Sequence, residues 1–439
     1  MEWLSFWITM PNLELPDGFP PIVIRHCDAA RREPGYILVS LGKSIRAISR
    51  FSEFEALIAL DQNGDVAWYW QSGVSLMDVK LTSKGTLLVL TTDGCIQEIN
   101  FSGNVLRKWS TPGRNPTNIK GSILVNTPYF HHAVQELPNG NFAALSITSR
   151  DFNDYPLNQE NPNGEKGPRR LVGDTLVEFQ PDGEIVNEFD FFEILDPYRF
   201  GYGLDGPFWS LVDVVPRGAD WSHANGLFYD RSDDSFIITV RHQDCAIKID
   251  RHTGKLNWIL GTPEGWSEHW QEKLLTPKHD IKWHWHPHDP SVTADGSIML
   301  FDNGASGAIP PTPRPDINTC FSRAIAYNVD ESAMTVEQVW SFGGRGSQLP
   351  YSMYVSGATE LTATGNIFVT FGGITLTKDK KKRTDLPPLG QGSVELFEVT
   401  RDNNPEILFH AEINNRDTEE CDGWAAFRAE WIPEGALSS

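Results

Sequence analysis

The chain lacks any apolar run long enough to cross a membrane. A membrane-spanning helix needs about 18 or more consecutive apolar residues, and the 439-residue sequence has no such run. Its N-terminus carries an acid at Glu2, no basic segment and only a short apolar stretch, which does not match a secretory signal. We therefore expect a cytoplasmic protein with no membrane partner, or a periplasmic or secreted one if the natural start lies upstream.

Basic residues are also scarce. The 37 Lys and Arg face 58 Asp and Glu, which leaves a net charge of −21. Binding to a phosphate backbone requires clustered basic side chains, so we expect no nucleic-acid partner. The single basic run, residues 378–383, is short and is predicted to be a solvated loop.

Cysteines are few and widely spaced, without a CxxC pair. This pattern favours reduced thiols over a disulfide framework or a zinc site. The five positions are Cys27, Cys95, Cys245, Cys320 and Cys421.

A hairpin signature recurs six times along the chain. Each copy has two apolar strands joined by a turn, often of the Asn-Gly or Asp-Gly kind, with an aromatic residue near the end of the second strand. Such a turn favours two residues with positive φ, which makes it a strong local signal for a hairpin. The copies are Ala56–Trp70, Gln97–Trp109, Leu176–Phe189, Ala246–Leu260, Ala324–Phe342 and Val394–His410.

A second pattern alternates with the first. His132 stands eight residues before Gly140, and His288 stands eight residues before Gly296. The same spacing from other turn glycines leads to Met77 and Gly357, and a copy one residue longer through its turn begins at His223. The segment 35–39 is a further candidate for an inner strand.

Six strand-rich units without helical periodicity predict an all-β fold, a six-bladed β-propeller with long loop insertions. A sandwich or a pair of barrels would not explain six similar units. We expect an N-terminal extension at 1–34, the propeller at 35–415 and a C-terminal tail at 416–439. The insertions are expected at Ser149–Gly173, Tyr198–Trp221 and Thr262–Trp285.

Equivalent positions of successive blades converge on the channel of a propeller. His132, His223 and His288 share one offset, so we expect three imidazoles around one mouth. Arg241 follows the predicted strand 235–240 and would add a planar, permanently charged group suited to a tetrahedral anion.

The segment 283–289 carries three histidines at alternate positions. If it is a strand, His284, His286 and His288 lie on one face. Alternate residues of a strand lie about 6.6 Å apart, which makes convergence on one metal ion unfavourable, so we expect no metal. The flanking Trp285 is a candidate wall for the substrate.

The segment Phe301-Asp302-Asn303-Gly304 reads as a turn, because Asn-Gly accepts positive φ. Its functional interpretation is that Asn303 or Asp302 orients a channel histidine by a hydrogen bond. The sequence alone leaves both open.

Taken together, these residues resemble the PAPS-independent arylsulfate sulfotransferases, over roughly residues 35 to 410 as judged by motif matching. The segments that carry the resemblance are Ser222-His223-Ala224-Asn225-Gly226, Arg241-His242-Gln243, Ile247-Lys248-Ile249-Asp250, Trp258-Ile259-Leu260-Gly261, His131-His132, His288-Asp289 and Ser322-Arg323-Ala324. The sequence departs from the familiar family context at Pro287 and at Asp289-Pro290, on either side of His288.

The resemblance implies a six-bladed propeller that transfers a sulfuryl group from an aryl sulfate to a phenol through a sulfohistidine, with no cofactor. It implies that His288 is the nucleophile, that Arg241 and His223 hold the sulfuryl oxygens, and that His132 or its neighbour His131 is the acid and base. Neighbours in a strand face opposite ways, and the repeat spacing favours His132 for the channel.

Further residues are expected to contact the substrate, a small aromatic anion. They are His131, His242, Asn303, Arg323 and Trp285. Two other functions are open: hydrolysis or lysis of another small anionic or sulfur-containing substrate at the same site, and a non-catalytic propeller scaffold. The scaffold would leave the shared histidine offset unexplained.

Overall fold

The structure is a computed structural model, and it describes residues 13–43, 54–112, 121–206, 208–209, 217–376, 391–414 and 423–438. The basic run at 378–383 and Cys421 lie outside these ranges. The four described cysteines form no disulfide. No helix in the described part of the chain is long and apolar enough to cross a membrane.

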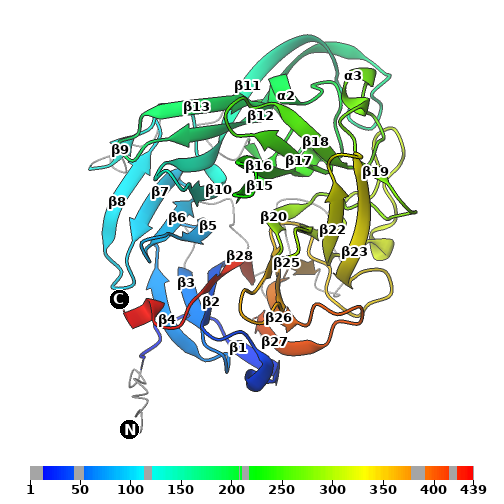
Figure 1. The fold of residues 1–439 in the computed structure, drawn as a ribbon. Helices are drawn as coiled ribbons and strands as arrows, with labels where there is room; N and C mark the ends of the chain where they lie inside the picture. The colour runs from blue at the N-terminus through cyan, green and yellow to red at the C-terminus, as the bar shows by residue number, and fades with distance from the viewer. Residues whose placement is uncertain are drawn as a thin grey trace, which may run out of the picture.

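Six mainly antiparallel sheets surround a common centre (Figure 1). The first two blades, each given from the innermost strand outwards, use one strand from the far end of the chain and eight from its beginning. Blade 1 is β28 (Trp424–Ile432), β2 (Tyr36–Lys43), β3 (Glu55–Leu60) and β4 (Val66–Gln71). Blade 2 is β5 (Leu76–Leu81), β6 (Leu87–Thr91), β7 (Cys95–Ile99), β8 (Val105–Ser110) and the short β9 (Ile123–Leu124).

The middle blades carry the histidine copies of the repeat. Blade 3 is β10 (His131–Glu136), β11 (Phe142–Pro156), β12 (Lys166–Phe179) and β13 (Ile185–Asp190), with β14 (Ala219–Asp220) paired to β12. Blade 4 is β15 (Ala224–Asp230), β16 (Ser235–Val240), β17 (Cys245–Asp250) and β18 (Leu256–Gly261).

The last two blades complete the ring. Blade 5 is β20 (His288–Val292), β21 (Ile298–Asp302), β22 (Arg323–Asp330), β23 (Thr335–Gly343) and β19 (Thr276–Pro277). Blade 6 is β24 (Gly357–Glu360), β25 (Ile367–Leu376), β26 (Gln391–Val399), β27 (Ile407–Asn414) and β1 (Ile22–Cys27). The described helices are short: α2 (Phe191–Ile194), α3 (Glu268–Gln271), η1 (Ala29–Arg31), η4 (Arg241–Gln243), η5 (Ile317–Thr319) and η6 (Ala436–Ser438).

The inner strands contact one another around the ring in the order β28, β5, β10, β15, β20, β24 and back to β28. Six apolar clusters lie between neighbouring blades, one at each junction. Each blade therefore buries both faces against its neighbours, which is how a propeller removes its exposed surface. The predicted all-β, six-bladed propeller is confirmed.

The aromatic residue of the repeated hairpin explains how blades dock. Trp68, Trp109, Trp258 and Trp340 pack into the clusters between blades. Each indole N–H also donates to the outer turn of the next blade along the chain, through Phe101 O, Pro181 O, Glu331 Oε1 and Asp402 O respectively. A buried indole needs such an acceptor, so the repeated tryptophan stabilises both the core and the spacing of the blades.

The expected segment boundaries need two corrections. The expected tail at 416–439 contains β28, which pairs with β2 from Tyr36↔Ile432 to Lys43↔Trp424 and is the innermost strand of blade 1. The expected extension at 1–34 contains β1, which pairs with β27 at the outer edge of blade 6. In each case the partner strand lies almost the whole chain away, so no local pattern marks the pairing.

The strand expected to open the propeller, 35–39, belongs to β2 and is the second strand of its blade. The insertion at 149–173 is a continuation of β11 and β12, which stay paired as far as Pro156↔Lys166. The other two insertions contain α3, β14, β19 and irregular chain.

Candidate active site

Two cavities meet where the inner strands begin. The first, which we call the histidine cavity, has a volume of about 100 Å³, and the second, the insertion cavity, has about 470 Å³. They share Phe208, His223 and Arg241. The insertion cavity also draws on the chain between β13 and β14 and between β21 and β22, including Gly203, Ser306 and Cys320.

Every blade contributes at least one residue on or just before its inner strand to the histidine cavity. These residues include Met77, His132, His223, His288, Val355 and Phe427. The three histidines that share an offset in the sequence therefore line one cavity, as the repeat predicted.

Local backbone geometry turns these side chains inward. His132 and His223 have φ values of 55° and 51°, in a region that residues other than glycine rarely adopt. Each of the strands β10, β15 and β20 pairs with the next strand of its blade, and in each pair the register shifts at or just after the histidine. Such a bulge re-aims a side chain at the rim of a sheet.

Hydrogen bonds define the tautomer of His288. The Asn303 amide donates through Nδ2 to the carbonyl oxygens of Ser352 and Val355, at 2.8 and 3.1 Å. Its Oδ1 is then the atom that accepts from His288 Nδ1, at 2.6 Å. In a neutral imidazole, protonated Nδ1 leaves a lone pair on Nε2. Nε2 of His288 is therefore the nitrogen with a free lone pair.

His288 is also held neutral. Burial disfavours the imidazolium and Arg241 repels it, which together put the pKa of His288 well below its usual value. A neutral imidazole attacks more readily than a protonated one, so the environment keeps this side chain ready to form a bond.

Arg241 lies in η4, directly after β16, as the sequence predicted. Its side chain is buried and lines both cavities. Nη1 lies 2.5 Å from His242 Nε2 and Nη2 lies 3.5 Å from Met353 O, and among the described residues no carboxylate forms an ion pair with it. A buried guanidinium without a carboxylate partner is suited to an anionic ligand.

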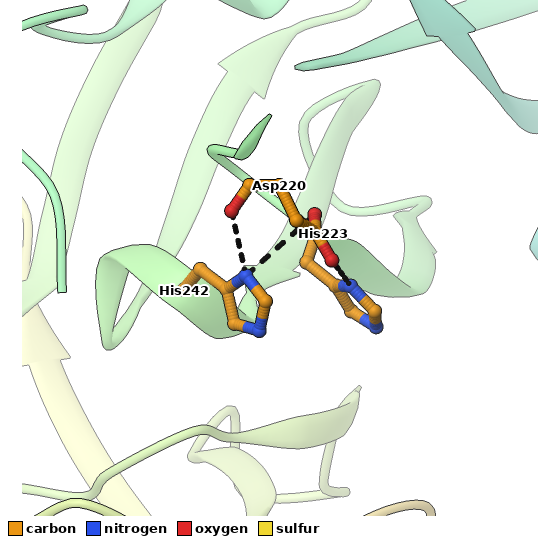
Figure 2. Close-up of side chains that lie close together, drawn as sticks. All are labelled: Asp220, His223 and His242. Carbon is orange, nitrogen blue, oxygen red and sulfur yellow. Dashed lines mark hydrogen bonds and ion pairs between the residues drawn. The ribbon is translucent and has the colours of Figure 1, made fainter. Parts of the chain in front are cut away.

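Behind Arg241, Asp220 connects two histidines (Figure 2). His223 Nδ1 lies 2.7 Å from Asp220 Oδ2, and His242 Nδ1 donates to the backbone oxygen of Asp220 at 2.8 Å. Burial raises the pKa of Asp220 to about 6 and lowers that of His242 to about 3. Burial and the charge of Arg241 put the pKa of His223 well below its usual value, so below about pH 6 the extra proton of this pair belongs to Asp220.

Asp220, His223 and His242 lie close enough together to hold a metal ion. Both Nδ1 atoms already face oxygens of Asp220, and the Arg241 guanidinium contacts the other nitrogen of His242. A metal ion at this point would break those hydrogen bonds, and the fixed positive charge of Arg241 would repel it. The donor set fits a proton-sharing network better than a metal centre.

The structure distinguishes the neighbours His131 and His132. His132 lines the histidine cavity, whereas His131 is fully buried behind it. Their Nδ1 atoms lie 2.8 Å apart. The inward position predicted for His132 agrees with this placement.

The histidines at 284, 286 and 288 do not share a face, because the strand begins only at His288. His286 has a φ of 52° and lines the insertion cavity, and its Nε2 donates to Tyr202 O at 2.8 Å. His284 lines neither cavity and contacts the hydroxyl of Tyr327. The interpretation of this segment as a strand was wrong.

Two residues expected to contact substrate lie behind the site. Arg323 donates to Asp302 Oδ2 at 2.8 Å, and Asp302 Oδ1 accepts from the backbone N–H of Trp285 and Gly304. Neither Arg323 nor Trp285 lines either cavity. Their shared carboxylate braces the turn that carries Asn303.

Sequence reasoning missed Asp220, Asp174, Phe208 and Arg428, which contact the site from other blades or insertions. One usable signal was the spacing of Asp220, three residues before His223. The others become neighbours of the site only through folding.

A family model described as arylsulfotransferase (ASST) matches residues 34–422. The chain belongs to the arylsulfotransferase family. Arylsulfate sulfotransferase AssT of Escherichia coli O6:H1 (strain CFT073) is 28% identical over 330 residues, 64% of this chain and 54% of that protein. The protein of the same name from Lelliottia amnigena is 26% identical over 297 residues, 57% of this chain and 49% of that protein.

This arylsulfotransferase-family chain thus spans about half the length of the curated relatives it matches. Among solved structures, a protein of unknown function from Bacteroides caccae is 10% identical, with a TM-score of 0.46, and the match covers 90% of this chain and 98% of that one.

Proposed function

We propose that this protein transfers a sulfuryl group from an aryl sulfate to a phenol in two steps, through a sulfohistidine at His288. The observation that carries the proposal is the position of His288 Nε2. This nitrogen belongs to a neutral imidazole whose tautomer is set by Asn303. It lines a cavity together with Arg241, which has no carboxylate partner among the described residues. Membership of the arylsulfotransferase family supports the same reaction class.

In the first step, Nε2 of His288 attacks sulfur and the bond between sulfur and the phenolic oxygen breaks, with its electron pair leaving on oxygen. A covalent intermediate splits one difficult displacement into two easier ones. The sulfonated imidazole keeps its proton on Nδ1, and Asn303 Oδ1 accepts that proton in a hydrogen bond at 2.6 Å. The second step reverses the first with a different phenol.

In this proposal Arg241 and His223 hold the sulfuryl oxygens, where negative charge develops in the transition state. For His223 this requires a proton on Nε2 in addition to the one shared with Asp220. Burial raises the pKa of Asp220 to about 6, so this extra proton is available at slightly acidic pH.

The aromatic body of the substrate has an apolar wall to pack against. Leu41, Leu76, Met77 and Phe427 line the histidine cavity on the side of blades 1 and 2. Burying an aryl ring there is favourable by roughly 25 cal/mol per Å² of apolar surface. The cavity therefore suits a phenol or an aryl sulfate better than a fully polar substrate.

The experiment is intact-protein mass spectrometry after mixing with 4-nitrophenyl sulfate. A mass gain of about 80 Da, one sulfuryl group, is expected on the wild type and not on His288→Ala, because the adduct needs the Nε2 nucleophile. His284→Asn is the matched control, since His284 is also buried but lines neither cavity; it should still form the adduct.

Absence of an adduct and of nitrophenolate release from the wild type would contradict the proposal. If the adduct decays equally fast with and without a phenol acceptor, the acceptor is water, and the reaction is hydrolysis and not sulfuryl transfer to a phenol.

A further inference from the structure

The acid and base of the proposed reaction faces an energetic problem. Burial and the positive groups around it put the pKa of His132 well below its usual value. On its own, His132 would therefore stay neutral near pH 7 and would have no extra proton to give to a poor leaving group. The charged and titratable groups that face it are His131 on the same strand, His223, His288 and Arg428.

Behind His132 stands a second imidazole with its own carboxylate. His131 Nδ1 lies 2.8 Å from His132 Nδ1, so one of these two atoms donates and the other accepts. On its far side, His131 Nε2 lies 3.2 Å from Asp174 Oδ1. The two atoms lie within ion-pair distance but do not form an aligned hydrogen bond, and neither atom has another hydrogen-bond partner.

Asp174 is itself held in place. Its Oδ2 accepts from Ser222 Oγ at 2.6 Å and from the backbone N–H of Ala224 at 2.5 Å. Both donors belong to the segment that carries His223, and Asp174 is fully buried. Because both donors contact Oδ2, Oδ1 is the carboxylate oxygen that faces His131 Nε2.

We propose that His131 and Asp174 form a proton store for His132, a role that rests on the proposed sulfuryl transfer. In the loaded state, His131 carries protons on both nitrogens beside ionised Asp174, and neutral His132 carries its proton on Nε2. His132 gives that proton to the departing phenolate oxygen. The proton on His131 Nδ1 moves to His132 Nδ1, and His131 becomes neutral.

The second half of the reaction refills the store. The acceptor phenol attacks sulfur, the bond between sulfur and His288 Nε2 breaks with its electron pair returning to nitrogen, and the phenol proton passes to His132 Nε2. The proton on His132 Nδ1 returns to His131 Nδ1. His131 is thus neutral between the half-reactions and holds its extra proton only before the donor reacts, in a place that water does not reach, since His131 has no exposed surface.

The test compares two donors that differ in their need for an acid. Phenyl sulfate has a poor leaving group and 4-nitrophenyl sulfate a good one. In His131→Phe and Asp174→Asn, kcat/KM for phenyl sulfate should fall by about 10² to 10³, in line with the contribution of a general acid, and by less than about tenfold for 4-nitrophenyl sulfate.

Ser222→Ala is the matched control, because it removes a hydrogen bond to Asp174 and keeps the carboxylate. It should change kcat/KM for both donors by the same factor. Equal losses on both donors in His131→Phe and Asp174→Asn would overturn the proton store while leaving sulfuryl transfer intact. A wild type that turns over neither donor would overturn both proposals.

A second measurement does not depend on turnover. In ¹⁵N spectra of the histidine side chains, the two facing Nδ1 atoms should divide into one protonated and one unprotonated resonance. In the loaded wild type both nitrogens of His131 should be protonated, whereas Asp174→Asn should keep the proton on His131 Nδ1 and remove the one on Nε2, because the new amide donates to His131 Nε2. Two protonated or two unprotonated Nδ1 resonances in the wild type would contradict the proposal.

Discussion

The ring of inner strands has a half that carries the proposed reaction, which we call the reactive half, and an apolar half. Blades 3, 4 and 5 place His132, His223 and His288 in the histidine cavity, whereas the lining from blades 1, 2 and 6 includes Phe427, Met77 and Val355. The six inner strands contact one another around one centre. One backbone frame therefore carries both a wall of histidines and an apolar wall.

The two halves are joined by a cation from the apolar side. Arg428 on β28 bonds to Asp289 at 3.0 Å, to Asn225 O at 2.8 Å and to His132 O at 3.3 Å, and its Nε lies 3.4 Å from Asp78. These partners belong to blades 2, 3, 4 and 5. The last strand of the ring thus fixes the backbone that positions two of the three histidines.

The largest predicted effect tests that link. Arg428→Met should lower the free energy of unfolding by about 3–5 kcal/mol, because it leaves Asp289 and Asp78 buried without their cation. Urea unfolding would measure it. The control is Arg25→Met, whose ion pair with Glu412 is partly exposed and should cost less than about 1 kcal/mol. Equal losses of unfolding free energy in the two variants would show that Arg428 does not hold the two halves together.

Next in size is the loss of the anion-binding group of the reactive half. Arg241→Met should lower kcat/KM for 4-nitrophenyl sulfate by about 10² to 10³, the usual cost of removing a donor aimed at developing charge. Steady-state kinetics would measure it. Arg314→Met is the comparison, because Arg314 lines only the insertion cavity and is half exposed. A greater loss of kcat/KM in Arg314→Met than in Arg241→Met would indicate that the sulfate binds in the insertion cavity.

A smaller effect concerns pH. Burial raises the pKa of Asp220 to about 6, so its pair with His223 holds the extra proton below that pH and loses it above. The KM for the donor should therefore rise about fivefold from pH 6 to 7. The groups around Asp220 are His242, Asp174 and Arg241.

The variant Asp220→Asn tests whether the pair of Asp220 and His223, and no other titratable group, causes the change in KM. The amide can donate to His223 Nδ1 and still accept from Trp209, which now donates to Asp220 Oδ1 at 2.9 Å. His223 Nε2 would then stay protonated, and KM should be flat over the same range. A slope that persists in Asp220→Asn would assign the titration to another group.

The smallest effect is expected on the apolar half. Met77→Leu conserves volume, and such exchanges usually cost less than about 1.5 kcal/mol, so kcat should stay within about threefold of the wild type. Steady-state kinetics with several aryl sulfates would measure it. A tenfold loss of kcat would mean that the apolar half takes part in the chemistry, and the division proposed here would fail.

Much of the fold was predictable because its signals are local. The six hairpins correspond to the outer strand pairs of the six blades, from β3 and β4 to β26 and β27. Turn residues and alternation act over a few residues. The role of β28 was not predictable, because its partner Tyr36 stands at the other end of the chain.

The same distinction holds for the site. The offset of His132, His223 and His288 was visible because the repeat carries it, and Arg241 because it ends a clear strand. The histidines at 284 and 286 were misplaced, since alternation suggested a strand where the chain is irregular. Asp174 and Arg428 were missed because only tertiary structure brings them to His131 and to Asp289.

The pairing of β28 with β2 sets a delay during synthesis. At about 5–20 residues per second, β28 leaves the ribosome roughly 20 to 80 s after β2. Until then the inner edge of β2 is uncovered and Asp78 has no Arg428 beside it. A nascent chain held in that interval has five complete inner strands and an open seam, with an uncovered sheet edge and an incomplete cavity.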